Sequence, residues 1–319
     1  MRALVVGGGS WGTAFACVLA RGGHEVTLAC RDPEPLRRDR ENRRYLPGVA
    51  LDASVLPMQL DLPRQCEAAE LVVLALPSGA TAELGLQLTG SAPVLLLAKG
   101  LDPHSSGLLS DRLEGVAGPV AVLSGPNHAE EIGRGRPAAA VLASASLDVA
   151  RALQRAIALP AFRLYASADV RGVQLAGASK NVIAIASGAA DALGFGDNAR
   201  AALMTRGLAE MARLGAALGA DPRTYSGLAG MGDLIATCTS RHSRNRRAGE
   251  LLAGGTAPAE LERAIGMTVE GVHTAPRLLR LAAAAAVELP ITEAVCAVLD
   301  GLPVHEAIPL LLERALADE

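Results

Sequence analysis

The feature that most constrains this chain is a glycine-rich turn near its start. An apolar run at residues 3–6 breaks at the sequence Gly-Gly-Gly-Ser-Trp-Gly, residues 7–12, before an alanine-rich segment and a second apolar run. Strand, glycine turn, helix and strand within about 30 residues indicate a dinucleotide-binding unit. In such a unit Gly7 permits the turn, Gly9 lets the backbone approach a pyrophosphate, and Gly12 lets helix and strand pack closely. A glycine turn without a ligand is the less favoured alternative.

The second strand is predicted at residues 25–30. In dinucleotide-binding units, the residue after this strand contacts the ribose. An acid there accepts a hydrogen bond from a 2′-hydroxyl, whereas an arginine accommodates a 2′-phosphate. Arg31 precedes Asp32 here, which favours NADPH and leaves NADH open; a solvated loop charge is the alternative for Arg31. The next arginines alternate with acids and are predicted to form a solvated helix face: Arg37, Arg38, Arg40, Arg43 and Arg44.

Five further apolar runs predict that residues 1–168 form an α/β domain of the Rossmann type. They lie at residues 71–76, 94–98, 120–123, 138–143 and 162–166. Most are uninterrupted, as in a parallel sheet covered on both faces, and ligands gather beyond the carboxyl ends of such strands. Lys99 follows one run and is expected where nicotinamide and substrate meet. His128 follows another, and we expect it to be structural rather than catalytic.

From about residue 169 the strand pattern disappears, so residues 169–319 are predicted to form an all-α domain. Lys180 lies in its first long helix, residues 172–193, among Ala, Ile, Gly and Val. Only two of the 30 basic side chains are lysines, Lys99 and Lys180. An amine can lose its proton whereas a guanidinium cannot. Burial of a charged ammonium in an apolar helix costs free energy, so a lysine without a function is not expected there. We therefore expect Lys180 to act as an acid or base; chance survival of two lysines is the alternative.

Polar residues further along extend this prediction. Asp233 follows a glycine-rich loop and is expected to cap a helix, to hold the charge of Lys180, or both. The most basic run begins at Ser240, which can start a helix with Arg244 and Asn245 in its first turns. An arginine at a helix N-terminus is a good phosphate receptor.

Two other features of the second half have structural interpretations. Residues 194–198, Gly-Phe-Gly-Asp-Asn, are predicted to form a turn between two long helices. Arg206, Glu210 and Arg213 share one face of the second helix at i, i+4 and i+7, and we expect them to form a solvated stripe.

Composition argues against several function classes. A net charge of −3 and few aromatic residues (2%) give no footprint for nucleic acid. Five scattered cysteines without C-x-x-C spacing fit free thiols in a reducing cytoplasm, and no metal-ligand spacing is visible. No apolar run has the length of a signal peptide or of a membrane span, which takes roughly 18 residues or more. Half the residues are hydrophobic, enough for a sizeable core in two domains.

The chain resembles the bacterial NAD(P)-dependent glycerol-3-phosphate dehydrogenases along nearly its full length. Six ordered segments carry the resemblance: residues 7–14, 124–126, 180–182, 194–198, 232–234 and 243–247. It implies reversible reduction of dihydroxyacetone phosphate to sn-glycerol 3-phosphate, which feeds phospholipid synthesis. It also implies a homodimer.

The resemblance also implies roles for individual residues. Lys180 matches the proton donor and acceptor, and Lys99 the second active-site lysine, near both nicotinamide and substrate. Substrate positions are matched by Gly125, Asn127, Asp233, Ser243, Arg244 and Asn245. Cofactor positions are matched by Ser10, Trp11, Arg31, Ala129, Arg244, Thr268 and Glu270.

This sequence departs from the family at two positions. Gly8 stands where Ala is usual, which we expect to be a harmless loosening of the turn, and Asn127 stands where Ser or Thr is common. Two other functions stay open from the residues themselves. One is a related two-domain reductase, of the ketopantoate or 6-phosphogluconate type. The other is a non-catalytic NADPH sensor, which would not need Lys180, Asp233 and Arg244 together.

Overall fold

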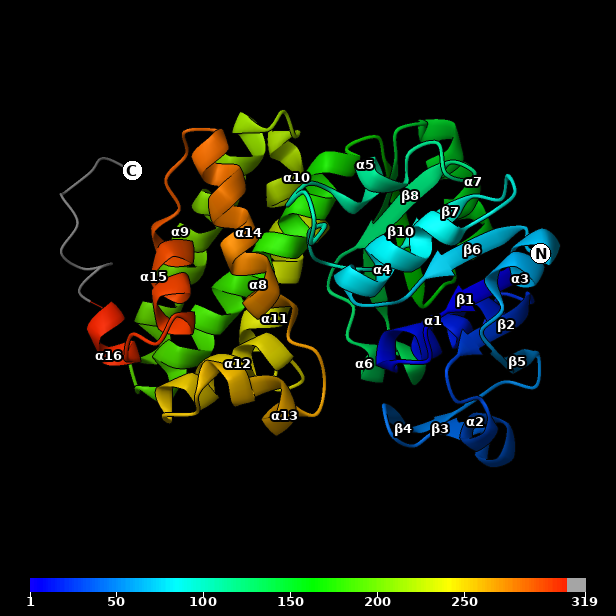
Figure 1. Cartoon of the computed structure of the whole chain (residues 1–319), viewed down its shortest axis with the longest axis horizontal. Coiled ribbons are helices and arrows are strands. Elements are labelled where there is room, and N and C mark those ends of the chain that lie inside the picture. Colours follow the sequence, from blue (N-terminus) through cyan, green and yellow to red (C-terminus); the bar gives the residue numbers. More distant parts are fainter. Residues whose placement is uncertain (309–319) are drawn as a thin grey trace. The chain divides into compact units, whose positions relative to one another are not determined.

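The computed structural model describes residues 1–308, and the chain separates after Gln174 into two compact units, Met1–Gln174 and Leu175–Glu319. This division falls inside helix α8 (Val170–Ala192). In Figure 1 the first unit runs from blue to green and the second from green to red. The first unit contains a sheet with helices, and the second is helical, which confirms the predicted combination of a Rossmann-type domain and an all-α domain.

The first unit is built on an eight-stranded sheet in the order β10-β9-β8-β7-β6-β1-β2-β5. All neighbouring pairs are parallel except β8 and β9. Its strands are β1 Arg2–Val6, β2 Glu25–Cys30, β5 Val55–Gln59, β6 Leu71–Leu74, β7 Val94–Leu96, β8 Val120–Ser124, β9 Ala138–Ser144 and β10 Phe162–Ser167. Its α-helices are α1 Ser10–Arg21, α2 Glu34–Asp39, α3 Leu62–Ala68, α4 Ser78–Leu84, α5 Leu109–Leu113, α6 Ala129–Gly133 and α7 Leu147–Ile157.

The strand order places a topological switch point at β1. From β1 the chain adds β2 and β5 on one side, and then β6, β7 and β8 on the other. In open parallel sheets, the crevice beyond the carboxyl ends at such a point is where ligands bind. The glycine turn follows β1 directly, so it lies at the carboxyl end of the strand where the order reverses.

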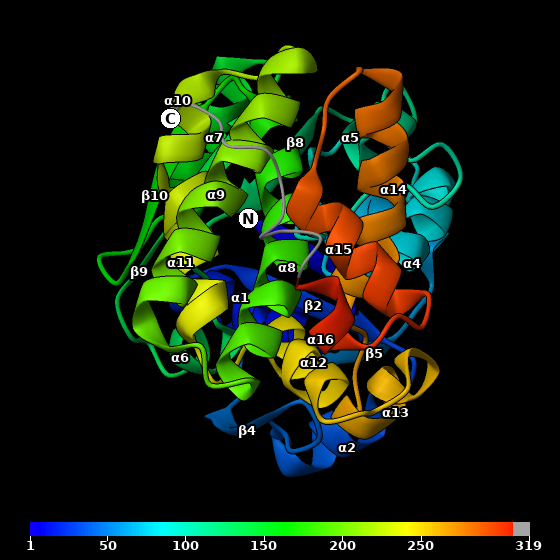
Figure 2. The same cartoon turned by 90° about the vertical axis from the view of Figure 1, so that its left-hand side faces the viewer.

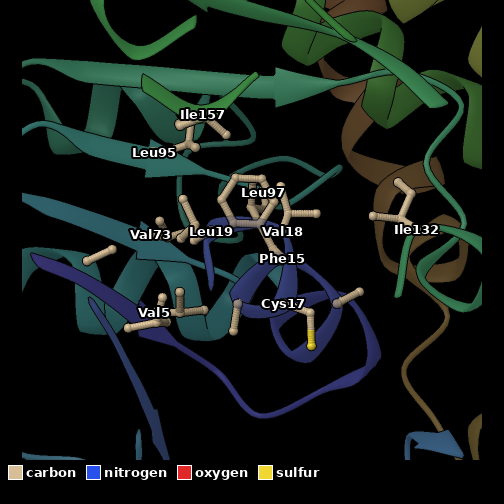
Figure 3. Close-up of a cluster of buried hydrophobic side chains, with 14 of the residues drawn as sticks. Val5, Phe15, Cys17, Val18, Leu19, Val73, Leu95, Leu97, Ile132 and Ile157 are labelled. Atoms are coloured by element: carbon tan, nitrogen blue, oxygen red, sulfur yellow. The ribbon is translucent and has the colours of Figure 1, made fainter. Parts of the chain in front are cut away.

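Helix α1 anchors the turn to the core of the first unit. Figure 3 shows Phe15, Val18 and Leu19 of α1 beside Val73 of β6 and Leu97, which directly follows β7, all of them buried. Burial of one such side chain contributes about 1.5–3 kcal/mol. The start of α1, and with it the glycine turn, is thus held by the hydrophobic core of this unit.

The arginine-rich segment after β2 departs from the prediction. Helix α2 ends at Asp39, because Arg40 takes a left-handed conformation (φ 49°), and a hairpin of β3 (Glu41–Asn42) and β4 (Leu46–Ala50) follows. The prediction of one solvated helix face is therefore wrong beyond Asp39. Arg37 Nε and Arg40 Nη1 donate to carbonyl oxygens of the edge strand β5, at 2.8 and 3.1 Å. These two arginines fasten the hairpin region to the sheet.

The second unit is helical throughout its described part. Its longer helices are α8, α9 (Gly196–Ala217), α12 (Arg244–Ala253), α14 (Glu270–Ala284) and α15 (Pro290–Leu299); the shorter ones are α10 (Pro222–Ser226), α11 (Asp233–Thr239), α13 (Leu261–Ile265) and α16 (Val304–Ala307). Helix α9 begins at Gly196, so the predicted turn is shorter than residues 194–198. None of the helices in residues 1–308 combines the length and the apolar character that crossing a membrane would take.

Helix α8 is the centre of the helical unit, and Figure 2 shows it among its neighbours. Its small residues allow close contact with α12. A Cβ added at Gly188 would lie 1.8 Å from the Arg246 carbonyl oxygen, and one at Gly249 would lie 1.9 Å from that of Ile185. Glycine is therefore required at this crossing, and Lys180 on α8 is held in a fixed relation to the start of α12.

The predicted solvated stripe on α9 is wrong for Glu210, which is 4% exposed. Its carboxylate accepts hydrogen bonds from the backbone amides of Ile291 (2.5 Å) and Thr292 (3.4 Å), at the start of α15. The first amides of a helix have no partner within it, so an acceptor from another helix satisfies them. Burial raises the pKa of Glu210 to about 7.

Candidate active site

The three glycines of the G-x-G-x-x-G pattern, Gly7, Gly9 and Gly12, have distinct structural roles. Gly7 has φ +119°, and a Cβ there would lie 2.4 Å from the Ala75 carbonyl oxygen; a Cβ at Gly12 would lie 1.9 Å from that of Gly7. Both are required by the fold itself. A Cβ at Gly9, in contrast, would meet nothing within 4 Å. The middle glycine is thus not required by the protein's own packing, which fits a backbone that a ligand approaches closely.

The start of α1 supplies hydrogen-bond donors beside this space. The amides of Ser10, Trp11 and Gly12 belong to the first turn of the helix, where amides have no intrahelical acceptor and favour an anion. The indole nitrogen of Trp11 is buried and has no hydrogen-bond partner among residues 1–308. These groups fit the pyrophosphate of a dinucleotide.

Two other predicted features of this region can be placed. Arg31 is exposed and follows β2 directly, as a residue that meets a ribose phosphate should. A Cβ at Gly8 would lie 2.8 Å from Cys30 Cβ, so alanine at this position would require Cys30 to shift. Gly8 is therefore matched to Cys30 in this chain, and the expectation of a harmless loosening was too simple.

Lys99 lies beyond β7, and its Nζ donates to the Gly125 carbonyl oxygen beyond β8 at 2.8 Å. Gly125 has φ +149°, and a Cβ there would lie 2.9 Å from Ala140 Cα, so only glycine fits without a shift. Two residues on, both amide atoms of the Asn127 side chain are buried and have no hydrogen-bond partner among residues 1–308. Ala129 begins α6, and His128 is the N-cap residue of that helix. Lys99, Gly125 and Asn127 are thus brought together at the carboxyl ends of adjacent strands.

Lys180 is buried, with 5% exposure, and so are its partners. Its Nζ donates to Asp233 Oδ1 at 2.8 Å and to Thr237 Oγ1 at 2.6 Å. The Thr237 hydroxyl in turn donates to the Asp233 carbonyl oxygen at 2.6 Å, which turns its lone pairs toward the amine. The amine is held by an acid and a hydroxyl from one turn of α11. Beside it, burial raises the pKa of the Cys238 thiol to about 12, so that thiol stays protonated.

The predicted pairing of Lys180 with Asp233 is present, but the predicted cap is not. Helix α11 begins at Asp233 itself, after a π-helical turn at Leu228–Gly232, and Gly232 is the N-cap residue. Asp233 lies inside the helix rather than before it, and its carboxylate faces Lys180. The i, i+4 spacing in the sequence places Thr237 on the same helix face as Asp233, but Thr237 was not predicted as a site residue.

The start of α12 carries the predicted phosphate receptors. Ser243, not Ser240, caps this helix: its Oγ accepts from the Arg246 amide at 3.1 Å. Arg244 Nη1 donates to the Thr268 carbonyl oxygen at 2.8 Å. Arg244 is therefore oriented at a helix N-terminus, which suits a bound anion.

Asn245 links α12 to the two neighbouring segments. Its Nδ2 donates to Asn181 Oδ1, and its Oδ1 accepts from the Gly271 amide, both at 2.9 Å. Asn181 is the residue after Lys180, and Gly271 follows Glu270 at the start of α14. The side chains that the sequence scatters between residues 180 and 271 thus form one connected site in the helical unit.

Comparisons with known proteins agree with this arrangement. Residues 3–150 match the model of the NAD-dependent glycerol-3-phosphate dehydrogenase N-terminus, and residues 169–309 match that of its C-terminus. Glycerol-3-phosphate dehydrogenase [NAD(P)+] of Moorella thermoacetica is 48% identical over 99% of this chain and 96% of that protein. The homologue of the same name from Desulfitobacterium hafniense is 44% identical over 99% of this chain and 92% of its own length.

Solved structures give the same result. The crystal structure of glycerol-3-phosphate dehydrogenase from Coxiella burnetii superposes with a TM-score of 0.93, at 37% identity over 98% of this chain and 99% of that one. A ketopantoate reductase from Ralstonia eutropha reaches a TM-score of 0.59 at 20% identity, over 97% of this chain and 100% of that chain. This second likeness concerns the fold alone.

Proposed function

The chain belongs to the NAD-dependent glycerol-3-phosphate dehydrogenase family, and from this premise we propose that it reversibly reduces dihydroxyacetone phosphate to sn-glycerol 3-phosphate. The observation that carries the proposal is the buried Lys180 amine, held at 2.8 Å by Asp233 and at 2.6 Å by Thr237. A protein that only senses a dinucleotide would not need a buried proton donor such as Lys180 in its helical unit.

The first unit would hold the dinucleotide by its glycine turn. Amides at the start of α1 donate to the pyrophosphate, the open space at Gly9 admits it, and the Trp11 indole N–H is a further donor. Reduced nicotinamide, when bound, supplies the hydride for the ketone carbon. Arg31 suits the 2′-phosphate of NADPH, and NADH is the alternative cofactor. Ala129, Thr268 and Glu270 are the remaining cofactor residues in this proposal.

Lys180 supplies the proton. As hydride reaches the ketone carbon, negative charge grows on the carbonyl oxygen, and the Lys180 ammonium donates a proton to it. The two acceptors, Asp233 Oδ1 and Thr237 Oγ1, orient two of the three N–H bonds of the ammonium. In the reverse direction the neutral amine takes the proton from the hydroxyl. Lys99 stabilises the growing charge, which in a site poor in water is worth more than in solution.

The start of α12 binds the phosphate. Arg244 supplies a charged donor, while Ser243 and Asn245 lie on either side of it along the chain. Gly125 and Asn127 contact the rest of the small substrate, which gives the buried amide of Asn127 a partner that residues 1–308 do not supply. Binding energy from the phosphate places the carbonyl for hydride and proton transfer.

The product would serve glycerophospholipid synthesis in the cytoplasm, and we expect the enzyme to be a homodimer. The test is a panel of ketones, phosphorylated and not, with NADPH and NADH as reductants and cofactor oxidation as the readout. Turnover with dihydroxyacetone phosphate, well above that with 2-keto acids, is the expected result. Preference for a 2-keto acid would instead favour a ketopantoate-type reductase. Tight NADPH binding without turnover of any ketone would favour a sensor.

A further inference from the structure

Asn42 is a buried amide in the short strand β3, and it was not recognised in the sequence. It is 2% exposed. Its Nδ2 donates to the Gly8 carbonyl oxygen at 2.9 Å and to Thr13 Oγ1 at 2.7 Å. Its Oδ1 accepts from the Tyr45 amide at 3.3 Å. Since one side of the amide meets a donor and the other meets two acceptors, the orientation of the group is determined by its neighbours.

The bond to Gly8 controls the direction of the next amide. In a trans peptide unit the carbonyl and the following N–H point in opposite directions within one plane. With the Gly8 oxygen held on the hairpin side, the Gly9 N–H is directed to the other side of the turn. No hydrogen bond among residues 1–308 occupies that Gly9 amide.

The second bond reaches the first helix itself. Thr13 lies in the first turns of α1, and its backbone amide donates to the Gly9 carbonyl oxygen at 3.0 Å. Asn42 therefore holds both ends of the segment that runs from Gly8 to Thr13. This segment contains all the amides that face the pyrophosphate in the proposed function.

The hairpin that carries Asn42 is a firm support. Leu46 and Val49 of β4 are buried in the core cluster of the first unit, with 0% and 4% exposure. Both pack on Gly133 of α6, where an added Cβ would lie 3.1 Å from each of them. The two-residue strand β3 is thus held in place by the rest of its hairpin. The hydrogen bonds of Asn42 to Gly8 and Thr13 then fix the glycine turn relative to this hairpin.

We propose that Asn42 is a positioning residue for the dinucleotide: it orients the Gly8–Gly9 peptide and the start of α1 toward the pyrophosphate. The inference rests on the proposed binding of the cofactor at the glycine turn. A buried asparagine that only stabilises the hairpin would make the same three bonds. The two roles differ in whether affinity for the cofactor changes independently of stability.

The experiment measures NADPH affinity by fluorescence titration, steady-state kinetics and melting temperature for Asn42→Ala. We expect the Kd for NADPH to rise about tenfold, the scale of one misdirected donor to an anion. The kcat at saturating NADPH and the KM for dihydroxyacetone phosphate should stay within about twofold, because the substrate-side residues are unchanged. Asn42→Asp keeps the shape but replaces the donor by an acceptor, so it should raise the Kd at least as much. This second variant serves if the alanine variant does not fold.

The matched control is Val49→Ala, which weakens the packing of the same hairpin and leaves the bonds to Gly8 and Thr13 in place. It should lower the melting temperature and leave the Kd within about twofold. An equal rise in Kd for Val49→Ala and Asn42→Ala would overturn the inference, as would an unchanged Kd in the Asn42 variants.

A further variant separates this inference from the proposed cofactor site. Gly9→Ala adds a methyl group where the protein has open space, so folding should be unaffected, while a pyrophosphate there would be obstructed. A raised Kd for Gly9→Ala with an unchanged Kd for Asn42→Ala refutes only the role of Asn42. An unchanged Kd for Gly9→Ala refutes the site itself, and the role of Asn42 with it.

Discussion

The two units contribute different kinds of groups to the proposed site: backbone amides in the first unit and side chains in the second. In the first unit the groups that meet the cofactor are mostly backbone amides, presented by a turn in which Gly7 and Gly12 are required by packing. In the second unit they are side chains from α8, α11 and α12, joined by hydrogen bonds such as that of Lys180 with Asp233. The first arrangement is local in sequence, and the second depends on the packing of several helices.

The two arrangements also differ in energetic cost. Amides at a helix start are unpaired within the helix wherever a helix begins, and water can satisfy them. Lys180 and Asp233 are 5% and 2% exposed, so both charges have lost most of their hydration. Removal of one partner from a buried pair typically costs about 3–5 kcal/mol, because the other charge stays behind. The catalytic half of the site is therefore the more fragile one.

The strongest test of this difference is Lys180→Arg. Arginine keeps the positive charge beside Asp233 but has no transferable proton at neutral pH. General acid catalysis contributes ~10²–10⁴ in rate, and we expect kcat to fall by that factor. The Kd for NADPH should stay within a few-fold, since the cofactor is held by the first unit. Melting temperature should be recorded as well, because the longer side chain must fit a buried site.

Arg151→Lys is the control for that exchange, since Arg151 is an exposed residue of α7. It should leave kcat unchanged. If Lys180→Arg turns over at a near-normal rate, the amine is only an electrostatic anchor, and Lys99 or a water supplies the proton.

The same contrast explains how much could be predicted from the sequence. The nucleotide-binding unit could be predicted because Gly7, Gly9 and Gly12 are close together in sequence. The role of each glycine depends on the strand and helix directly beside it. Lys180 could be predicted as a site residue because it is one of two lysines among 30 Lys and Arg residues and lies in an apolar helix. The start of α12 was misplaced at Ser240, because Ser240 and Ser243 have equal capping ability and only the observed backbone decides between them.

Residues whose partners are distant in sequence were missed. Asn42 lies 34 positions from Gly8 and 29 from Thr13. Glu210 lies 81 positions from Ile291, and its spacing with Arg206 and Arg213 suggested a solvated stripe instead. Periodicity identifies the face of a helix, but it cannot identify which other helix will cover that face.

The next largest effect is expected for Arg244→Ala, which tests whether the start of α12 anchors the phosphate. Loss of a charged partner costs about 2–5 kcal/mol in kcat/KM with dihydroxyacetone phosphate. With unphosphorylated dihydroxyacetone the variant should resemble the native enzyme, because that substrate has no phosphate to lose. Equal losses on both substrates would mean that Arg244 has another role.

Glu210→Gln examines the cost of burial in the helical unit without touching the proposed site. Burial raises the pKa of Glu210 to about 7, despite bonds from Ile291 and Thr292 and the nearby Arg213. The fold therefore favours the protonated acid more than the unfolded chain does. Its contribution to stability is fully present below the unfolded pKa, near 4.5, and is lost as pH rises through about 7.

Glutamine is neutral at every pH and keeps an oxygen for the Ile291 amide. Relative to the native protein, the variant should gain up to about 3 kcal/mol of stability between pH 5 and 8. Denaturant unfolding at several pH values measures this difference. A stability difference that does not change with pH would show that Glu210 is charged throughout, held by the start of α15.

The smallest effect is expected for Arg31→Ala, at the exposed edge of the cofactor half. The side chain lies after β2 in solvent, where an ion pair typically contributes less than about 1 kcal/mol, so affinity for NADPH should fall by roughly fivefold or less. Affinity for NADH should hardly change, because NADH lacks the 2′-phosphate. Titration of both cofactors at two salt concentrations measures the effect, which should shrink at high salt because exposed charges are screened. Equal losses for the two cofactors would assign Arg31 to the pyrophosphate or to the fold, and the backbone groups of the turn would then bind the cofactor without help from this charge.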